Sequence, residues 1–342
     1  MNNSFNLKGI SMVWLSKTDL SNLNAGEGGG GNVTELKTYD NGRKPYASGQ
    51  SVRHAIRQAV ERNNQGVFKC TPESPCGNVQ DCWLCDMFGY LNPKLGEGFN
   101  RRWSPIKVTP ALGQIASEVV TDMLIRMSDK TKSDGKSKPD KEDTLLQTSE
   151  ETEQDEEAEE KGGSKDQRIA YVQIMSNVYR IGLSLDIANL GKVIEPVYEG
   201  KGKEQKFRNW QIVTDVGGEE RIKRAIALLN AVGGIADFAK QARNATSLSP
   251  DIFIAGMHPR YSHRILRALV LDDKGSINPE ELRVVLQDLQ DDGVKLFFGF
   301  TPQVVTNQEV LISTIKEFNL DPVNPIRALQ NLMDAVRNAS IE

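Results

Sequence analysis

The chain is poor in histidine and cysteine, since its 342 residues include only three histidines and four cysteines. His54, His258 and His263 have neither a spacing typical of a metal site nor a neighbouring pair of carboxylates. The serines in Ser48-Gly49-Gln50-Ser51 lack the pattern of a nucleophile elbow. With no visible pair of nucleophile and base, the sequence predicts a protein that is not an enzyme.

Long apolar runs are also missing. No run approaches the length needed to cross a bilayer, and the first residues, Met-Asn-Asn-Ser-Phe-Asn, do not resemble a signal peptide. We therefore expect a soluble, cytoplasmic protein with no membrane partner. A hydrophobic content of 38% suffices for a core, and the length allows two average domains or one core with large insertions.

The net charge of −4 is unevenly distributed along the chain. Residues 129–166 hold 14 acidic and 7 basic residues, so the remainder carries a net charge of +3. A mildly basic body suits a nucleic-acid partner, although enzymes often have this balance too. The acidic segment has almost no apolar residues and is predicted to be a disordered loop. Its charge could also keep nucleic acid from binding out of place.

Residues 45–62, PYASGQSVRHAIRQAVER, are the most informative segment. Their apolar residues recur at a spacing of three to four, which predicts a helix that Ser48 or Ser51 can cap. Arg53 and His54 lie in its first turns, and Arg57 lies one turn beyond Arg53. A capped helix start beside a guanidinium is a suitable phosphate site. An ordinary amphipathic helix with solvated basic residues is the alternative.

Two glycine-containing segments could approach a nucleic-acid backbone closely. The run at residues 26–31 could cradle a phosphate, but it lacks the Lys-Ser/Thr of a nucleotide P-loop and could simply be a flexible loop. Gly233-Gly234 follows a basic helix with Arg221, Lys223 and Arg224 and precedes Lys240 and Arg243. These cations could neutralise phosphates, although charged helix faces are often only solvated.

All four cysteines fall within sixteen residues, with the spacing C-x5-C-x5-C-x2-C. Four thiolates suffice for a closed tetrahedral zinc site, and a reducing cytosol disfavours disulfides. We predict a structural zinc held by Cys70, Cys76, Cys82 and Cys85. Free structural thiols are the alternative.

Helices and strands alternate along the chain. Strands are predicted at residues 5–15, 168–175, 178–187 and 210–214, and helices at residues 51–63, 110–126, 219–232, 279–290 and 324–338. This order favours an α+β fold with a ferredoxin-like core of the kind found in RNA-recognition domains.

Taken in order, several segments resemble the DevR-type family of CRISPR-associated proteins, the backbone subunits of type I Cascade effector complexes. They are the apolar residues 10–15 with the glycine loop, Ser-Gly-Gln-Ser-Val-Arg-His (48–54), CWLCDMFGYL (82–91), SNVYRIGLSLDIANLGKV (176–193) and the helix ending in Gly233-Gly234. The resemblance implies a guide-RNA-binding (crRNA-binding) subunit that polymerises along the guide and presents it for pairing with target DNA. Its implied partners are crRNA, the target DNA strand, further copies of itself and other Cascade subunits.

The resemblance also assigns domains and sites. Residues 1–64 and 167–342 would form the RNA-binding palm, with a thumb hairpin near residues 194–209, and residues 65–166 a finger insertion that includes the acidic loop. The implied RNA-binding residues are Lys17, Asn24, Lys44, Ser48, Gln50, Ser51, Arg53, His54, Arg57, Gly233, Gly234, Lys240 and Arg243.

Two other functions remain open from the sequence. Related type III backbone proteins cleave target RNA with an aspartate in the loop after the first strand, where Asp19 is expected, although residues 16–22 match that motif poorly. A zinc-stabilised transcriptional regulator is the other alternative, but no basic helix-turn-helix stands out.

Overall fold

The computed structural model describes residues 5–24, 33–92, 100–126, 168–200, 206–238 and 244–341. The glycine run 26–31, the acidic segment 129–166, Lys240 and Arg243 all lie outside the described residues.

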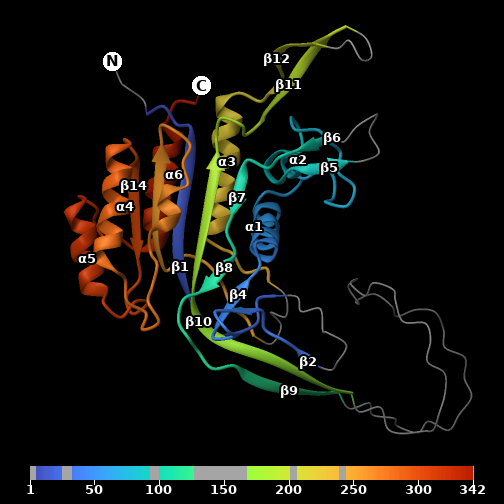
Figure 1. The fold of residues 1–342 in the computed structure, drawn as a ribbon. Helices are drawn as coiled ribbons and strands as arrows, with labels where there is room; N and C mark the ends of the chain where they lie inside the picture. Colours follow the sequence, from blue (N-terminus) through green and yellow to red (C-terminus); the bar gives the residue numbers. More distant parts are fainter. Residues whose placement is uncertain are drawn as a thin grey trace, which may run out of the picture.

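A large antiparallel sheet is built around strand β1 (Gly9–Ser21), which pairs with β13 (Ile252–His258) on one side and β10 (Arg168–Asp186) on the other. The first eight residues of β1 are all buried, because helices cover both faces of the sheet there. This explains why the strand reads as an apolar run without polar alternation. The first part of β10 extends past the end of its pairing with β1. There it pairs with β9, and the two strands form an arm (Figure 1).

The main path through the sheet runs β14-β13-β1-β10-β8-β4-β3, and β2, β7 and β9 also pair with β10. Every pair along this path is antiparallel. The remaining strands of the sheet are β2 (Val33–Thr34), β3 (Thr38–Tyr39), β4 (Lys44–Ala47), β7 (Ile106–Val108), β8 (Ala111–Gly113), β9 (Val120–Arg126) and β14 (Lys295–Phe300).

Two hydrophobic cores lie on opposite faces of the sheet. Met12 and Trp14 of β1 point into a core shared with α1 (Gly49–Asn63), α3 (Gly218–Val232) and α6 (Pro325–Arg337). Val13 and Leu15 point into the other core, with α4 (Pro279–Asp291), α5 (Gln308–Glu317) and the 3-10 helix η2 (Arg264–Arg267). The side chains of a strand alternate between faces, so a single strand contributes to both cores.

Two small units lie outside the large sheet and the helices that cover it (Figure 1). One contains α2 (Trp83–Phe88), β5 (Tyr90–Asn92) and β6 (Asn100–Arg102), and lies beside α1. Gly89 ends α2 with a positive φ of 68°, and a Cβ there would lie 2.5 Å from the Arg102 carbonyl oxygen, so only glycine fits. The other unit is a protruding hairpin of β11 (Lys192–Glu199) and β12 (Lys206–Asp215).

The predicted mixture of helices and strands is confirmed, and so are the helices expected at residues 51–63, 219–232, 279–290 and 324–338. The helix predicted over residues 110–126 is wrong, because this segment forms β8 and β9. Both strands pair with β10, which lies far away in the sequence. Local pattern cannot reveal such pairing.

The predicted strands needed smaller corrections. Only the second part of the segment 5–15 is in β1, which continues to Ser21. The segments 168–175 and 178–187 form one strand, β10, and residues 210–214 belong to β12. Within the described part of the chain, no helix combines the length and the apolar character that a membrane span requires.

Candidate nucleic-acid interface

The start of α1 is capped as the sequence predicts. The Ser51 backbone N–H donates to Ser48 Oγ at 3.2 Å, and Ser51 Oγ donates to the Leu23 carbonyl oxygen at 2.8 Å. Asn24 Oδ1 accepts from the Ser48 N–H at 3.2 Å, and Asn24 Nδ2 donates to the Tyr46 carbonyl oxygen at 2.8 Å. The side chains of Asn24, Ser48 and Ser51 therefore fix the end of β1 against the beginning of the helix.

Arg53 has a packing role that the sequence did not reveal. Its guanidinium donates to the carbonyl oxygens of Ile106, at 3.2 Å, and Phe88, and its Cζ lies 5.4 Å from the centroid of the Phe88 ring. Burial lowers the pKa of Arg53 from its ordinary value. The residue joins α1 to β7 and α2, and a phosphate contact would have to be made alongside these bonds.

Gln50, His54 and Arg57 lie on the outer face of α1, at positions i, i+4 and i+7. Gln50 and His54 are exposed, and Arg57 Nη2 lies 2.9 Å from His54 Nδ1. This face could meet an anionic ligand without disturbing the core.

Lys17 and Lys44 have other partners. Lys17 Nζ donates to the Gln303 carbonyl oxygen at 3.2 Å, in the loop after β14. Lys44 Nζ lies 2.5 Å from Asp273, and the hydrogen bond from Lys44 lowers the pKa of that carboxyl. A phosphate contact by either lysine would compete with these partners, and their predicted roles in RNA binding stay predictions.

Gly233 and Gly234 directly follow α3, and their N–H groups donate to the carbonyl oxygens of Leu229 and Ala231 respectively. Both glycines are exposed. A helix C-terminus carries the negative end of the helix dipole, which does not favour phosphate. Their predicted role in RNA binding stays a prediction, as do those of Lys240 and Arg243, which lie outside the described residues.

The suggestion that Arg221 and Arg224 neutralise phosphates is wrong in this structure. Their side chains are 2% and 1% exposed, and they pair with Asp215 and Asp86 respectively. Both guanidiniums are therefore compensated inside the protein.

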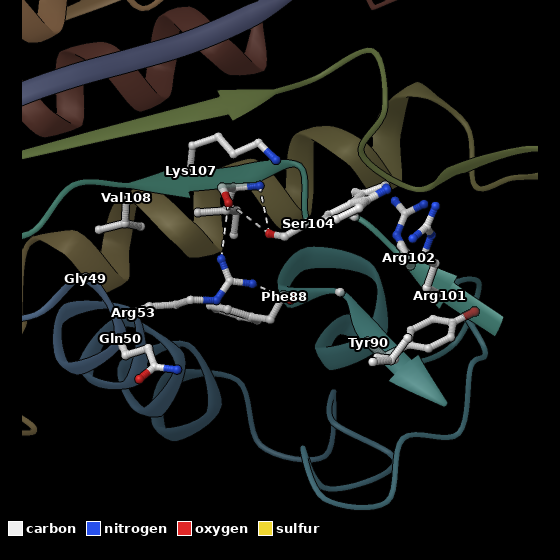
Figure 2. Close-up of a pocket in the computed structure, with 14 residues that line it drawn as sticks. Gly49, Gln50, Arg53, Phe88, Tyr90, Arg101, Arg102, Ser104, Lys107 and Val108 are labelled. Atoms are coloured by element: carbon white, nitrogen blue, oxygen red, sulfur yellow. Dashed lines mark hydrogen bonds between the residues drawn. The ribbon is translucent and has the colours of Figure 1, made fainter. Parts of the chain in front are cut away.

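Sequence reasoning missed a cleft of about 660 Å³ beside α1. Figure 2 shows Gln50 and Arg53 of α1 at one side and Lys107 of β7 at the other. Its lining includes four cationic residues and no acidic one; the cations are Arg53, Arg101, Arg102 and Lys107. The contiguous Arg101-Arg102-Trp103 was the available signal, because cations next to an aromatic are typical of nucleic-acid binding.

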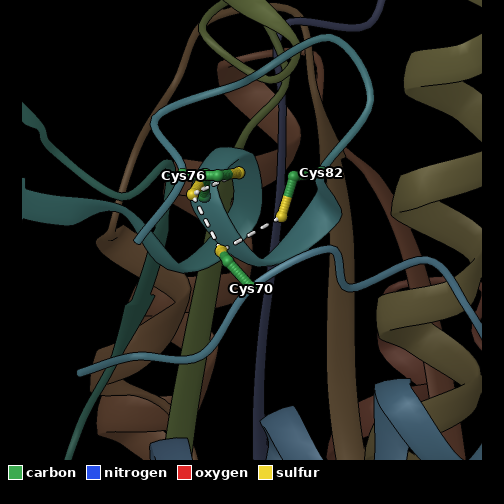
Figure 3. A group of neighbouring side chains, drawn as sticks. Cys70, Cys76 and Cys82 are labelled. Carbon is green, nitrogen blue, oxygen red and sulfur yellow. Dashed lines mark hydrogen bonds between the residues drawn. The ribbon is translucent and has the colours of Figure 1, made fainter. Parts of the chain in front are cut away.

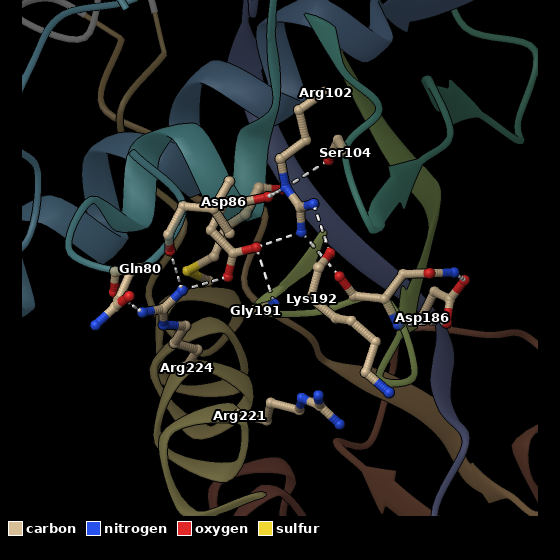
Figure 4. A network of polar contacts seen from close by, with 12 residues as sticks. Gln80, Asp86, Arg102, Ser104, Asp186, Gly191, Lys192, Arg221 and Arg224 are labelled. Atoms are coloured by element: carbon tan, nitrogen blue, oxygen red, sulfur yellow. Dashed lines mark hydrogen bonds and ion pairs between the residues drawn. The ribbon is translucent and has the colours of Figure 1, made fainter. Parts of the chain in front are cut away.

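Asp86 of α2 is a fully buried carboxylate that links three parts of the chain (Figure 4). It pairs with Arg102 of β6 and, at 2.6 Å, with Arg224 of α3. It also accepts from the Gly191 N–H at 2.9 Å, at the base of the protruding hairpin. Arg102 donates further to the carbonyl oxygens of Asn189 and Lys192. This network fixes the α2 unit to both α3 and the hairpin.

The four cysteines come together as the sequence predicts (Figure 3), with all Sγ atoms within 4.8 Å of one another. The distances from Cys70 to Cys82 and Cys85 are 3.5 and 3.4 Å, and Cys76 lies 3.7 Å from Cys85. In a tetrahedron with Zn–S bonds of about 2.3 Å, sulfurs are about 3.8 Å apart, so the cluster fits a zinc ion. The Lys69 N–H donates to Cys82 Sγ at 3.3 Å. The hydrogen bond from Cys85 lowers the pKa of the Cys82 thiol from its ordinary value.

Asp19, the candidate catalytic residue of the endonuclease alternative, does not lie in a loop. It is an exposed residue of β1, where the pairing with β10 shifts between Thr18 and Ser21. Within the described residues, it belongs to no cluster of three or more His, Cys, Asp or Glu suited to a metal ion.

Comparison with known proteins gives a family match over residues 17–249, to the model described as CRISPR-associated negative auto-regulator DevR/Csa2. The chain belongs to the DevR/Csa2 family. The resemblance seen in the sequence is thereby confirmed. No curated protein matches.

Solved structures share the fold of this DevR/Csa2 protein. One, titled "CRISPR RNA-guided surveillance complex", is 14% identical with a TM-score of 0.53, over 96% of this chain and 99% of the other. A second, titled "CRISPR RNA-guided surveillance complex, pre-nicking", is 10% identical with a TM-score of 0.51, over 96% and 100%. At such identities, the likeness concerns the fold alone.

Proposed function

We propose that this DevR/Csa2 protein is a non-catalytic, guide-RNA-binding backbone subunit of a type I CRISPR surveillance complex. Copies of it would bind side by side along the crRNA in the cytoplasm, with other subunits, and hold the guide for pairing with target DNA. Sequence choice would then come from base pairing, and the protein would contact mainly the backbone of the guide. The single observation that carries the proposal is the family match.

The connectivity supports an RNA-recognition core. In the order β1, α1, β8, β10, α3, β13, the strands lie side by side as β13-β1-β10-β8, all antiparallel, with α1 and α3 on one face. We assign this arrangement to the ferredoxin-like class, which RNA-recognition domains use. We assign the core to the palm, formed by residues 1–64 and 167–342 together with β7 and β8, and the rest of the insertion at residues 65–166 to the fingers.

The protruding hairpin fits the role of the thumb. Most of its residues are exposed, including Tyr198, Phe207 and Trp210, whose rings contact one another at centroid distances of 6.2 and 5.7 Å. A monomer rarely exposes so many large apolar side chains together. A neighbouring copy or the guide would cover them in an assembled complex.

We assign a structural zinc to Cys70, Cys76, Cys82 and Cys85. Four sulfurs leave no open position for water, so the ion would stabilise the fold of the finger without a catalytic role. Cys82 and Cys85 flank the beginning of α2, which carries Asp86, so the ion would also fix the network that Asp86 makes.

The test is to purify the protein with any copurifying nucleic acid and to measure its binding to labelled single-stranded RNA. We expect RNA of uniform length to copurify, and binding to weaken steeply with salt, because phosphate contacts release counterions. Incubation with labelled target RNA and a divalent metal, for the wild type and Asp19→Asn, addresses the endonuclease alternative. Cleavage that Asp19→Asn abolishes would overturn the non-catalytic proposal, and absence of RNA binding would overturn the function altogether.

A further inference from the structure

Trp103 lies between β6 and β7 and is 75% exposed, although tryptophan is usually largely buried. The Cζ of Arg101 lies 5.2 Å from the centroid of its ring. Packing of the monomer gives no reason for so large an apolar surface to face solvent at this position.

Two hollows meet at Trp103. The cleft of about 660 Å³ extends from it to Gln50 and Arg53 of α1. A second hollow of about 360 Å³ extends from it to Lys192 and Ile194, at the base of the protruding hairpin. Both are lined by Arg101, Trp103 and Lys107. The tryptophan therefore stands in a groove that connects α1 with the hairpin.

The charges around Trp103 favour the binding of an anionic ligand. Arg101 and Lys107 have no ion pair with an acidic residue among the described residues, whereas Arg102 is compensated by Asp86. The cleft is lined by cations without a carboxylate, and acidic groups (Asp186 and Glu195) enter only in the second hollow. A planar aromatic surface that lines the same hollows as two unpaired cations matches the chemistry of a nucleotide chain, which has a base with a π-face and a phosphate on either side of it.

We infer that Trp103 is a stacking platform for one base of single-stranded nucleic acid, and that Arg101 and Lys107 bind the adjacent phosphates. This inference rests on the proposed function and adds the contact that holds a base. Stacking on an aromatic does not depend on sequence, because every base offers a π-face.

Fluorescence anisotropy with labelled single-stranded RNA of several unrelated sequences tests the inference. We expect Trp103→Ala to weaken binding about tenfold or more for every sequence, with an unchanged salt dependence, and Trp103→Phe to restore most of the affinity. Arg101→Ala and Lys107→Ala should each lower the slope of log affinity against log salt by about one. Ile326→Ala, which truncates a side chain 71% exposed on α6, is the control and should bind like the wild type.

Adding complementary DNA to guide-loaded protein, and measuring its affinity as well, shows which of the two strands stacks on Trp103. A loss of guide affinity in Trp103→Ala assigns it to the guide, and a loss confined to the DNA assigns it to the target. Wild-type affinity of Trp103→Ala for both strands would overturn the stacking role while leaving the proposed function intact. Failure of the wild type to bind any RNA would instead reject the proposed function.

Discussion

At the scale of single residues, Asp86 is the residue whose replacement we expect to destabilise the folded protein most. Its carboxylate is fully buried and compensates two guanidiniums, those of Arg102 and Arg224, which are themselves 9% and 1% exposed. Removing one partner of a buried ion pair is costly, because it leaves a charge uncompensated away from water, here above all that of Arg102.

We predict that Asp86→Asn lowers the free energy of unfolding by about 3–5 kcal/mol, as expected when one partner of a buried ion pair is removed. Urea denaturation followed by circular dichroism measures this. Asp321→Asn, which removes an exposed carboxylate, should change stability by less than about 0.5 kcal/mol. Equal stabilities of the two variants would show that the Asp86 network contributes little.

His258 makes stability depend on pH. Its side chain is fully buried beside Ser11, and Nε2 lies 2.5 Å from Ser11 Oγ. Burial, together with the charge of His263, lowers its pKa from 6.5 to about 4. The folded protein keeps this imidazole neutral while the unfolded chain protonates it, so stability is full above pH 6.5 and falls as the pH drops toward 4.

We predict that this histidine alone removes roughly 3 kcal/mol of stability between pH 7 and pH 4, at about 1.4 kcal/mol for each unit of pKa shift. Urea denaturation across that range should therefore give a flatter pH dependence for His258→Gln than for the wild type. His54→Gln, at an exposed histidine of α1, should follow the wild-type curve. Parallel curves for all three proteins would exclude His258 as the titrating group.

At the scale of elements, the unit of α2, β5 and β6 has little core of its own and depends on its connections. α2 has six residues, and β5 and β6 have three each, which is too short for independent stability. The cysteine cluster and the Asp86 network supply what the short elements lack.

We predict close to one zinc per chain in metal-replete protein, and loss of that metal in Cys82→Ser. Metal binding and local folding share one free energy, so the variant should also become protease-sensitive at residues 66–100 while the core stays folded. Elemental analysis and limited proteolysis measure the two effects. Ser74→Ala, in the same segment, should keep its zinc, and a metal-free wild type with normal protease resistance would leave the cysteines as packing residues.

At the scale of the whole molecule, the acidic segment 129–166 lies between two paired strands. Arg126 of β9 and Arg168 of β10 are opposite each other in the sheet, so the two residues that flank residues 127–167 lie at adjacent positions. A connection between adjacent ends can be shortened at little cost, because the entropy of loop closure depends only weakly on length.

We predict that deleting residues 132–164 leaves folding and assembly on RNA intact, with stability changed by about 1 kcal/mol in the favourable direction. Thermal denaturation and size-exclusion chromatography with guide RNA check both properties. A variant with the same residues in scrambled order separates the effect of length from that of sequence. A large drop in Tm, or failure of the shortened chain to assemble, would show that the segment takes part in the fold.

The sequence by itself determined the features that depend on neighbouring residues. The cap at Ser48, the helix after it and the clustering of four cysteines within sixteen residues all follow from local spacing. The order of such local motifs was also enough to identify the DevR/Csa2 family. Helix caps and apolar periodicity act within one or two turns, so they can be read without knowing what the helix packs against.

Only the tertiary structure decided which side chains are available to a ligand. Arg53 and Arg224 read as cations for phosphate, but each has partners inside the protein that lie far away in the sequence. Residues 110–126 form strands because β10 supplies their partner. Burial and strand pairing are set by contacts between segments that are distant in the sequence, so a local sequence pattern cannot reveal them.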